Sequence, residues 1–113
     1  MTEAAWLLRD GEVLAALEVA ATRRSRRRGL LRRDGIDGAL LLRPARSVHT
    51  IGMRFAIDTV YLSSRGSVIR VATMLPGRLG PIVLRARHIL ELQAGEASRL
   101  GIGPGTTLIR TGP

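Results

Sequence analysis

The sequence predicts a mainly β fold of the α+β class, a small antiparallel β-sandwich or barrel of jelly-roll-like form with two short helices. Three observations support this prediction. Short apolar segments recur along the chain, turns rich in Gly, Pro and Asp separate them, and 113 residues leave room for one hydrophobic core. Hydrophobic residues make up 45% and charged residues 24% of the chain, a balance that excludes wholesale disorder. We therefore expect one domain over residues 1–113.

The first two strands are predicted over residues 5–9 and 12–21, as a hairpin. Asp10-Gly11 joins them, and this pair suits a tight hairpin turn in which both central residues have positive φ. The second segment, EVLAALEVAA, would also suit a helix because it is rich in Ala, Leu and Glu. The preceding turn and the short total length favour a strand.

A surface helix is predicted over residues 22–33, TRRSRRRGLLRR. Thr22 suits the N-cap because its hydroxyl can accept a hydrogen bond from the first turn. Arginines occupy most of the helix circumference, and Leu30 and Leu31 are the only large apolar anchors. We expect the helix to lie on the protein by its C-terminal end.

Alternating or fully apolar runs between turns predict the remaining elements. Strands are expected over residues 38–42, 56–62, 67–74, 87–93 and 106–110, and a short helix over 94–100 with Gly101 just past its end. Residues 76–86, with two prolines and two glycines, are expected to form a loop. Within 56–62, one side should carry Ile57, Thr59 and Tyr61, and the other Asp58, Val60 and Leu62.

Charge is strongly positive and uneven. All 18 basic residues are arginine, against nine acids, for a net charge of +9. Residues 22–54 hold ten of the arginines and two of the acids, so the excess concentrates there. This pattern suits either a solvated basic face or a surface that binds a polyanion such as nucleic acid, although three aromatic residues are few for stacking on bases. The arginines of the polyanion hypothesis are Arg23, Arg24, Arg26, Arg27, Arg28, Arg32 and Arg33.

Several classes of site are excluded by composition. The absence of cysteine excludes disulfides, thiolate zinc sites and a cysteine nucleophile. The two histidines, His49 and His88, stand 39 positions apart without metal-binding spacing, so we expect no metal or other cofactor and an exposed His88 at a strand start. No apolar run is long enough for a transmembrane segment, and no signal peptide is visible, so we expect a cytoplasmic protein.

The densest polar cluster is SVHTIGMRFAID, residues 47–58. We predict a non-enzymatic domain that binds a small ligand or a protein partner there. His49 would make one hydrogen bond, Met53 would give an adaptable apolar contact, and Arg54 would bind an anionic group or else hold Asp58. The alternatives are a polar network that pins a bend and a hydrolase using Ser47, His49 and Asp58. The candidate ligand-binding residues are Ser47, His49, Thr50, Met53, Arg54 and Asp58.

Four motifs together resemble the uncharacterised domain-of-unknown-function family 192, over residues 12–110. They are the Gly-Leu-Leu step at residues 29–31, HTIGMRFAID at 49–58, ILELQAG at 89–95 and Gly-Pro-Gly at 103–105. The resemblance implies a small, mainly β domain of the sandwich or jelly-roll kind with short helices. It implies no activity, because the family has no established one.

The chain departs from the pattern of that family at several positions. Ala56 replaces the usual proline, and Ala45, after Pro44, replaces a cysteine of many relatives. If that cysteine were functional, this chain would lack its function. Residues 63–64 replace an acidic turn, Thr106 replaces the acid of the last motif, and the export signal of many relatives is not visible.

Overall fold

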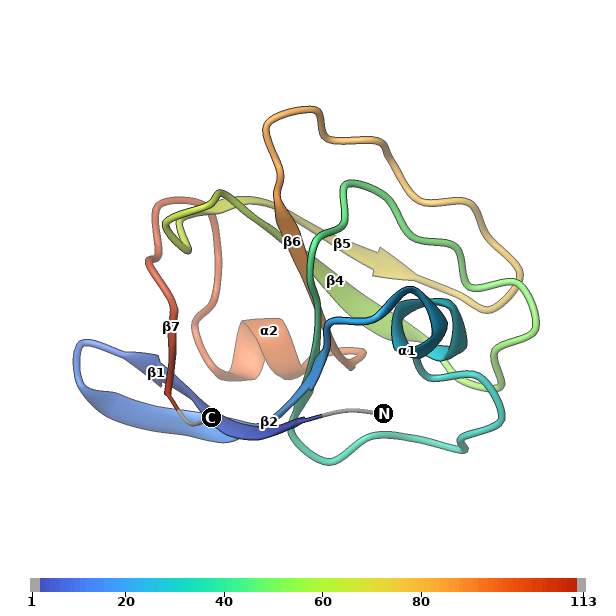
Figure 1. Cartoon of the computed structure of the whole chain (residues 1–113), viewed down its shortest axis with the longest axis horizontal. Coiled ribbons are helices and arrows are strands. Elements are labelled where there is room, and N and C mark those ends of the chain that lie inside the picture. Colours follow the sequence, from blue (N-terminus) through green and yellow to red (C-terminus); the bar gives the residue numbers. More distant parts are fainter. Residues whose placement is uncertain (1–2, 112–113) are drawn as a thin grey trace.

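The computed structural model describes residues 3–111 and confirms the mainly β prediction (Figure 1). In chain order the elements are β1 (Glu3–Arg9), β2 (Glu12–Ala20), α1 (Arg23–Arg28), β3 (Ala39–Leu42), β4 (Ile57–Leu62), β5 (Val68–Met74), β6 (His88–Gln93), α2 (Glu96–Arg99) and β7 (Ile109–Thr111). No helix in this described part is long and apolar enough to cross a membrane.

The seven strands form one sheet in the order β5-β4-β6-β3-β2-β1-β7. The β2–β3 pair is parallel, and the other pairs are antiparallel. The two ends of the sheet approach each other, because Val68 N donates to Thr106 O at 2.8 Å and Leu108 N donates to Gly66 O at 2.9 Å. Only an isolated bridge, Ser67–Thr107, results, so the sheet curls without closing and is a barrel only loosely.

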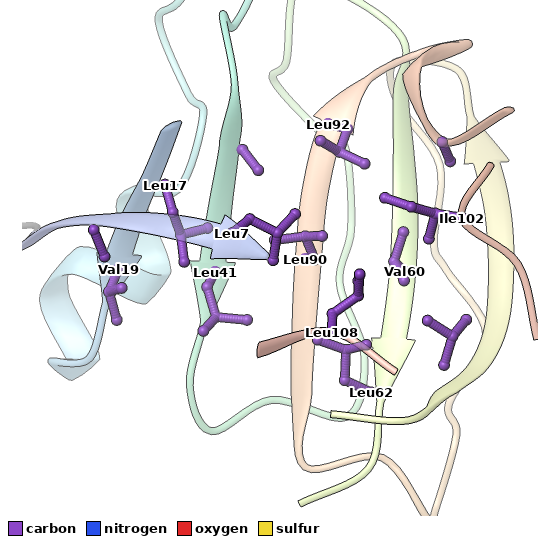
Figure 2. Close-up of a cluster of buried hydrophobic side chains, with 14 residues drawn as sticks. Leu7, Leu17, Val19, Leu41, Val60, Leu62, Leu90, Leu92, Ile102 and Leu108 are labelled. Carbon is purple, nitrogen blue, oxygen red and sulfur yellow. The ribbon is translucent and has the colours of Figure 1, made fainter. Parts of the chain in front are cut away.

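The main core fills the inside of the curled sheet. All the strands from β1 to β6 contribute buried side chains to it, and α2 adds Ala97 (Figure 2). Val60 and Leu90 at its centre are fully buried. The residues labelled in Figure 2 are Leu7, Leu17, Val19, Leu41, Val60, Leu62, Leu90, Leu92, Ile102 and Leu108.

The outer face of the sheet is also covered. Ile57 packs with Leu30, Met53 and Phe55 in a second cluster, while Tyr61 packs with Ala86 and Ile89 in a third. The alternation predicted for β4 is therefore confirmed. All six of its residues are buried because side chains pack against both faces of this strand. The outer face is covered by α1 with the two long loops before β4 and before β6, which lie beside each other at the His49–Leu79 bridge (Figure 1).

The predicted hairpin turn is confirmed, but the first helix is shorter than predicted. Asp10 and Gly11 have φ of 51° and 80°, as a tight turn of this kind requires. Thr22 caps α1, accepting from Ser25 N at 3.0 Å while its own N–H donates to Ser25 Oγ. The helix ends at Arg28 instead of 33 because Gly29 takes φ of 46° and turns the chain, which places Leu30 in the outer core.

The C-terminal elements are close to their predicted positions. α2 spans four residues, and Gly101 has φ of 69° just past its end, as expected. The last strand begins at Ile109 instead of 106, because residues 103–106 form a turn and Leu108 is buried in the main core.

Candidate functional site

A pocket of about 320 Å³ lies on the outer face of the sheet, between the end of α1 and the segment that follows β3. Both regions that the sequence singled out contribute to it. Its lining comprises Arg26, Arg27, Arg28, Gly29, Leu30 and Leu31 from one side, and Leu42, Pro44, Ala45, Ser47, Val48, His49, Met53 and Glu91 from the other side and the floor. We call it the outer pocket.

The rim of the outer pocket is basic and polar. Arg27, Arg28, Ser47 and His49 are exposed. Arg26 is half-buried and donates through Nη1 to Ala21 O at 2.9 Å and to Arg43 O at 3.2 Å, so the fold holds its guanidinium in place. The rim therefore combines one fixed arginine with two that reach into solvent, an arrangement that suits an anionic group.

His49 is oriented by its own backbone. Its Nδ1 accepts a hydrogen bond from Ile51 N at 3.2 Å. The neutral ring then carries its proton on Nε2, so Nε2 is a donor toward a ligand. The bridge between His49 and Leu79 fixes the backbone at this position.

The floor of the outer pocket holds a buried carboxyl group. Glu91 lies in β6, opposite Leu40 and Thr59 on the two neighbouring strands, and its residue is 3% exposed. Burial raises the pKa of Glu91 to about 7, against a smaller lowering by Arg33. Arg33 is itself bound to Glu18 at 2.7 and 3.0 Å, and no hydrogen bond reaches the Glu91 carboxyl from residues 3–111.

Gly29 lies next to the Glu91 carboxyl. A Cβ atom on Gly29 would lie 3.7 Å from Glu91 Oε1, in ordinary contact with it. Leu30, Leu42 and Met53 are buried beside the carboxyl as the apolar part of the lining. The pocket thus offers an apolar body, one polar group at its floor and cationic groups at its rim, which is the general composition of a small-molecule site.

Three of the six predicted ligand-binding residues line the outer pocket, namely Ser47, His49 and Met53. Thr50 lines none of the pockets described here, because its hydroxyl is buried, donating to Leu75 O at 2.6 Å and accepting from Arg78 N at 2.9 Å. Arg54 is exposed and pairs with Asp34 at 3.2 Å and not with Asp58, the alternative partner that the sequence suggests.

Asp58 holds α2 on the inner side of the sheet. Its Oδ2 accepts from Gly95 N and Ala97 N, both at 3.0 Å, and its Oδ1 accepts from Thr73 Oγ1 at 2.7 Å. Ser47, His49 and Asp58 therefore do not assemble as a triad: the carboxylate serves α2, and His49 Nδ1 accepts from a backbone N–H instead of donating to an acid.

The seven arginines of the polyanion hypothesis have different environments. Arg26 and Arg33 are held by the hydrogen bonds given above, whereas the other five are exposed. Arg27 and Arg28 share the rim of the outer pocket with His49, so two sites predicted separately meet at one place.

Glu91 was missed as a site residue. Its signal in the sequence was a charged residue inside the apolar strand segment ILELQ, where a solvated carboxylate is not expected. Within residues 3–111, no group of three or more His, Asp or Glu side chains is placed to hold a metal ion.

Two solved structures share this fold. A protein of unknown function from Novosphingobium aromaticivorans DSM 12444 matches with a TM-score of 0.78 and 18% identity, covering 96% of this chain and 84% of its own. A "putative transcription regulator" from Sinorhizobium meliloti 1021 matches with a TM-score of 0.72 and 21% identity, covering 97% of this chain and 94% of its own. At these identities the likeness shows the fold alone.

A comparison with curated proteins gives no match. The comparison with family models gives one over residues 6–109, to a family described as "Uncharacterized ACR". The match covers nearly all of the chain and agrees with the motifs noted in the sequence. The chain belongs to DUF192, the domain-of-unknown-function family 192.

Proposed function

We propose that this domain binds a small anionic molecule in the outer pocket, without chemical conversion. One observation carries the proposal: the carboxyl of Glu91, to which no other residue within 3–111 donates a hydrogen bond, lies at the floor of a pocket rimmed by arginines and His49. A carboxyl that the fold leaves without a protein partner in a pocket is available to bond to a ligand.

The rim selects for an anionic oxygen group. Arginine guanidinium groups bind phosphate or carboxylate with paired, charge-assisted hydrogen bonds. Arg27 and Arg28 supply these groups, and His49 Nε2 adds a donor. The net charge of +9 also favours the approach of anions.

The floor selects for a hydrogen-bonding group at the other end of the ligand. With a pKa of about 7, Glu91 is close to half protonated at neutral pH, so it either donates to or accepts from a ligand hydroxyl. Leu30, Leu42 and Met53 contact the carbon skeleton between the two ends. The ligand class is therefore a small phosphorylated or carboxylated alcohol.

Binding without catalysis is proposed because the pocket lacks an activated nucleophile. No hydrogen bond joins Ser47 to His49 in the part of the chain that the structure describes. A serine nucleophile needs an adjacent base, which in turn needs an orienting group.

The test is an amide NMR titration with glucose 6-phosphate, with glucose and inorganic phosphate as single-feature controls. We expect glucose 6-phosphate to shift the amides of residues 26–31, 47–49 and 91 more strongly than either control. The double variant Arg27→Ala/Arg28→Ala should weaken binding by at least tenfold, since each lost charged hydrogen bond costs about 1.5–3 kcal/mol.

The matched control is Arg23→Ala/Arg24→Ala, which removes the same charge from the same helix at positions that do not line the pocket. Its affinity should stay within about twofold of the unmodified protein, allowing for a small long-range charge effect. Equal losses in the two double variants would show that charge alone, and not the pocket, attracts the anion.

A second candidate function is polyanion binding through the five exposed arginines, Arg23, Arg24, Arg27, Arg28 and Arg32. Their clustering supports it, and so, weakly, does the regulator designation of the Sinorhizobium neighbour. With five phosphate contacts on duplex DNA, affinity should fall roughly 500-fold between 50 and 200 mM salt. For DNA binding, Arg27→Ala/Arg28→Ala and Arg23→Ala/Arg24→Ala should weaken the affinity equally, whereas Glu91→Gln should leave it unchanged.

A further inference from the structure

A second pocket of about 270 Å³ opens at one end of the curled sheet, on the inner side. We call it the inner pocket. Its walls are the apolar side chains of Leu7, Leu17, Leu41, Leu62 and Leu108, all of which belong to the main core (Figure 2). Elsewhere in this core, Ile102 is buried and α2 is packed against β4 and β6. The inner pocket is therefore lined mainly by apolar side chains of the main core.

The entrance of the inner pocket is basic. Arg43, Arg65, Arg110 and His88 line it, and no Asp or Glu does. Arg65 is exposed in the turn between β4 and β5, and Arg43 is half-buried just after β3. Neither of these two guanidinium groups makes a hydrogen bond or ion pair with another residue among those described.

His88 is the buried polar group of this entrance, contrary to the expectation that it would be exposed. It begins β6 opposite Leu62 and is half-buried, and its Nδ1 atom is buried without a hydrogen-bond partner within residues 3–111. Burial, and then the charges of Arg43, Arg110 and Arg87, lower the pKa of His88. The positive charges that lower this pKa also favour an anion at the entrance.

An anion at the entrance would bond to the two guanidinium groups that have no protein partner, those of Arg43 and Arg65. The leucine walls behind it would contact a hydrocarbon chain.

We propose that the inner pocket binds a carboxylate with a short unbranched apolar tail, a medium-chain alkanoate, with its head at Arg43 and Arg65 and its tail against the leucines that line the pocket. An apolar tail is expected because, apart from the basic entrance and the exposed Ser64, only apolar side chains and Gly66 line the pocket. A short one fits because the volume of about 270 Å³ is at the small end for ligand pockets. This site is separate from the outer pocket and shares no lining residue with it.

The test is an amide NMR titration of the whole chain with sodium octanoate, sodium hexanoate and 1-octanol. We expect octanoate to shift residues 41–43, 64–66, 88 and 108–110 in a saturable way. Hexanoate should bind about 15-fold more weakly, at about fourfold for each methylene lost from the apolar contact. Octanol, with the same tail and no charge, should bind at least tenfold more weakly than octanoate.

Arg65→Glu should weaken octanoate binding by at least tenfold, and the exposed turn position of Arg65 leaves the core intact. The matched control is Arg85→Glu, the same charge reversal at an exposed arginine that lines neither pocket. Three results would overturn the proposal: no saturable shift at the inner pocket, equal binding of octanol and octanoate, or equal losses in the two variants.

Discussion

Asp58 on β4 accepts a hydrogen bond of 3.0 Å from the backbone N–H of Ala97, 39 residues further along the chain. The same oxygen accepts from Gly95 N at 3.0 Å. The N-cap of α2 is Gly95, which has no side chain to bond the first turn. Asp58 therefore provides from a neighbouring strand the carboxylate that a helix start normally receives from its own N-cap.

Asp58→Ala should lower the free energy of unfolding by about 3 kcal/mol. The substitution removes three hydrogen bonds and leaves the N–H group of Ala97 buried without a partner. Asp58→Asn retains one acceptor oxygen and should cost roughly half as much. Urea denaturation measures both values. If the alanine variant were as stable as the asparagine variant, the carboxylate would not be holding α2.

Thr50→Val should lower the free energy of unfolding by about 2 kcal/mol without changing ligand binding at the outer pocket. The valine keeps the shape of the side chain but loses the hydroxyl that joins Leu75 O and Arg78 N. The loop before β6 should then exchange its amide hydrogens faster, most visibly at Gly77 and Arg78. Thr50→Ser keeps the hydroxyl and should retain slow exchange. A loss of binding in Thr50→Val at unchanged stability would return Thr50 to the ligand site.

Features that depend on neighbours in the sequence were predictable here. The two-residue period of β4 gave the correct faces for Val60 and Tyr61, and Thr22 was identified as a cap, because both follow from local geometry. The end of α1 was predicted wrongly because the arginine-rich segment continues to favour a helix up to residue 33. The local signal was Gly29, whose φ of 46° ends the helix at Arg28 and directs Leu30 into the outer core.

Features that depend on the curl of the sheet were not predictable. His88 was expected to be exposed at a strand start, but this strand start faces the inside of a curled sheet. Glu91 lies between Leu40 and Thr59 only because β6 is placed between β3 and β4. The arginine helix and the 47–58 segment were treated as rival sites, since nothing in their separation along the chain indicates that Arg28 and His49 share a pocket.

Glu91→Gln should change how stability depends on pH. The pKa of Glu91 is raised to about 7 in the folded protein, from an ordinary value of 4.5. The folded state therefore holds more protons than the unfolded state between these two pH values, and stability falls as pH rises through this window. The free energy of unfolding falls by about 3 kcal/mol in total across this window. The full decrease is reached above pH 7, and there is no decrease below pH 4.5.

The measurement is the unfolding free energy of both proteins from pH 4 to pH 8. Other carboxyl groups titrate in both, so the difference between the two profiles isolates Glu91. The glutamine variant should gain about 3 kcal/mol relative to the unmodified protein between the two ends of this range. Parallel profiles would show that the Glu91 carboxyl is solvated. If Glu91→Gln is more stable than the unmodified protein at pH 8 and also loses glucose 6-phosphate binding, the buried carboxyl lowers stability but is needed for ligand binding.

Ala45→Cys should place a single reporter thiol in the wall of the outer pocket. The chain has no cysteine, so any thiol labelling would come from this position, and Ala45 is half-buried beside Pro44 and Ser47. Iodoacetamide should label it slowly but completely. Saturating glucose 6-phosphate should slow the labelling, by about 11-fold at a ligand concentration ten times the Kd, because only the unoccupied fraction reacts.

The matched control is Ser64→Cys, an exposed position on the inner pocket, whose labelling should respond to octanoate and not to glucose 6-phosphate. Protection of both thiols by one ligand would mean that the two pockets are not independent, and protection of neither by glucose 6-phosphate would remove the outer pocket as its site.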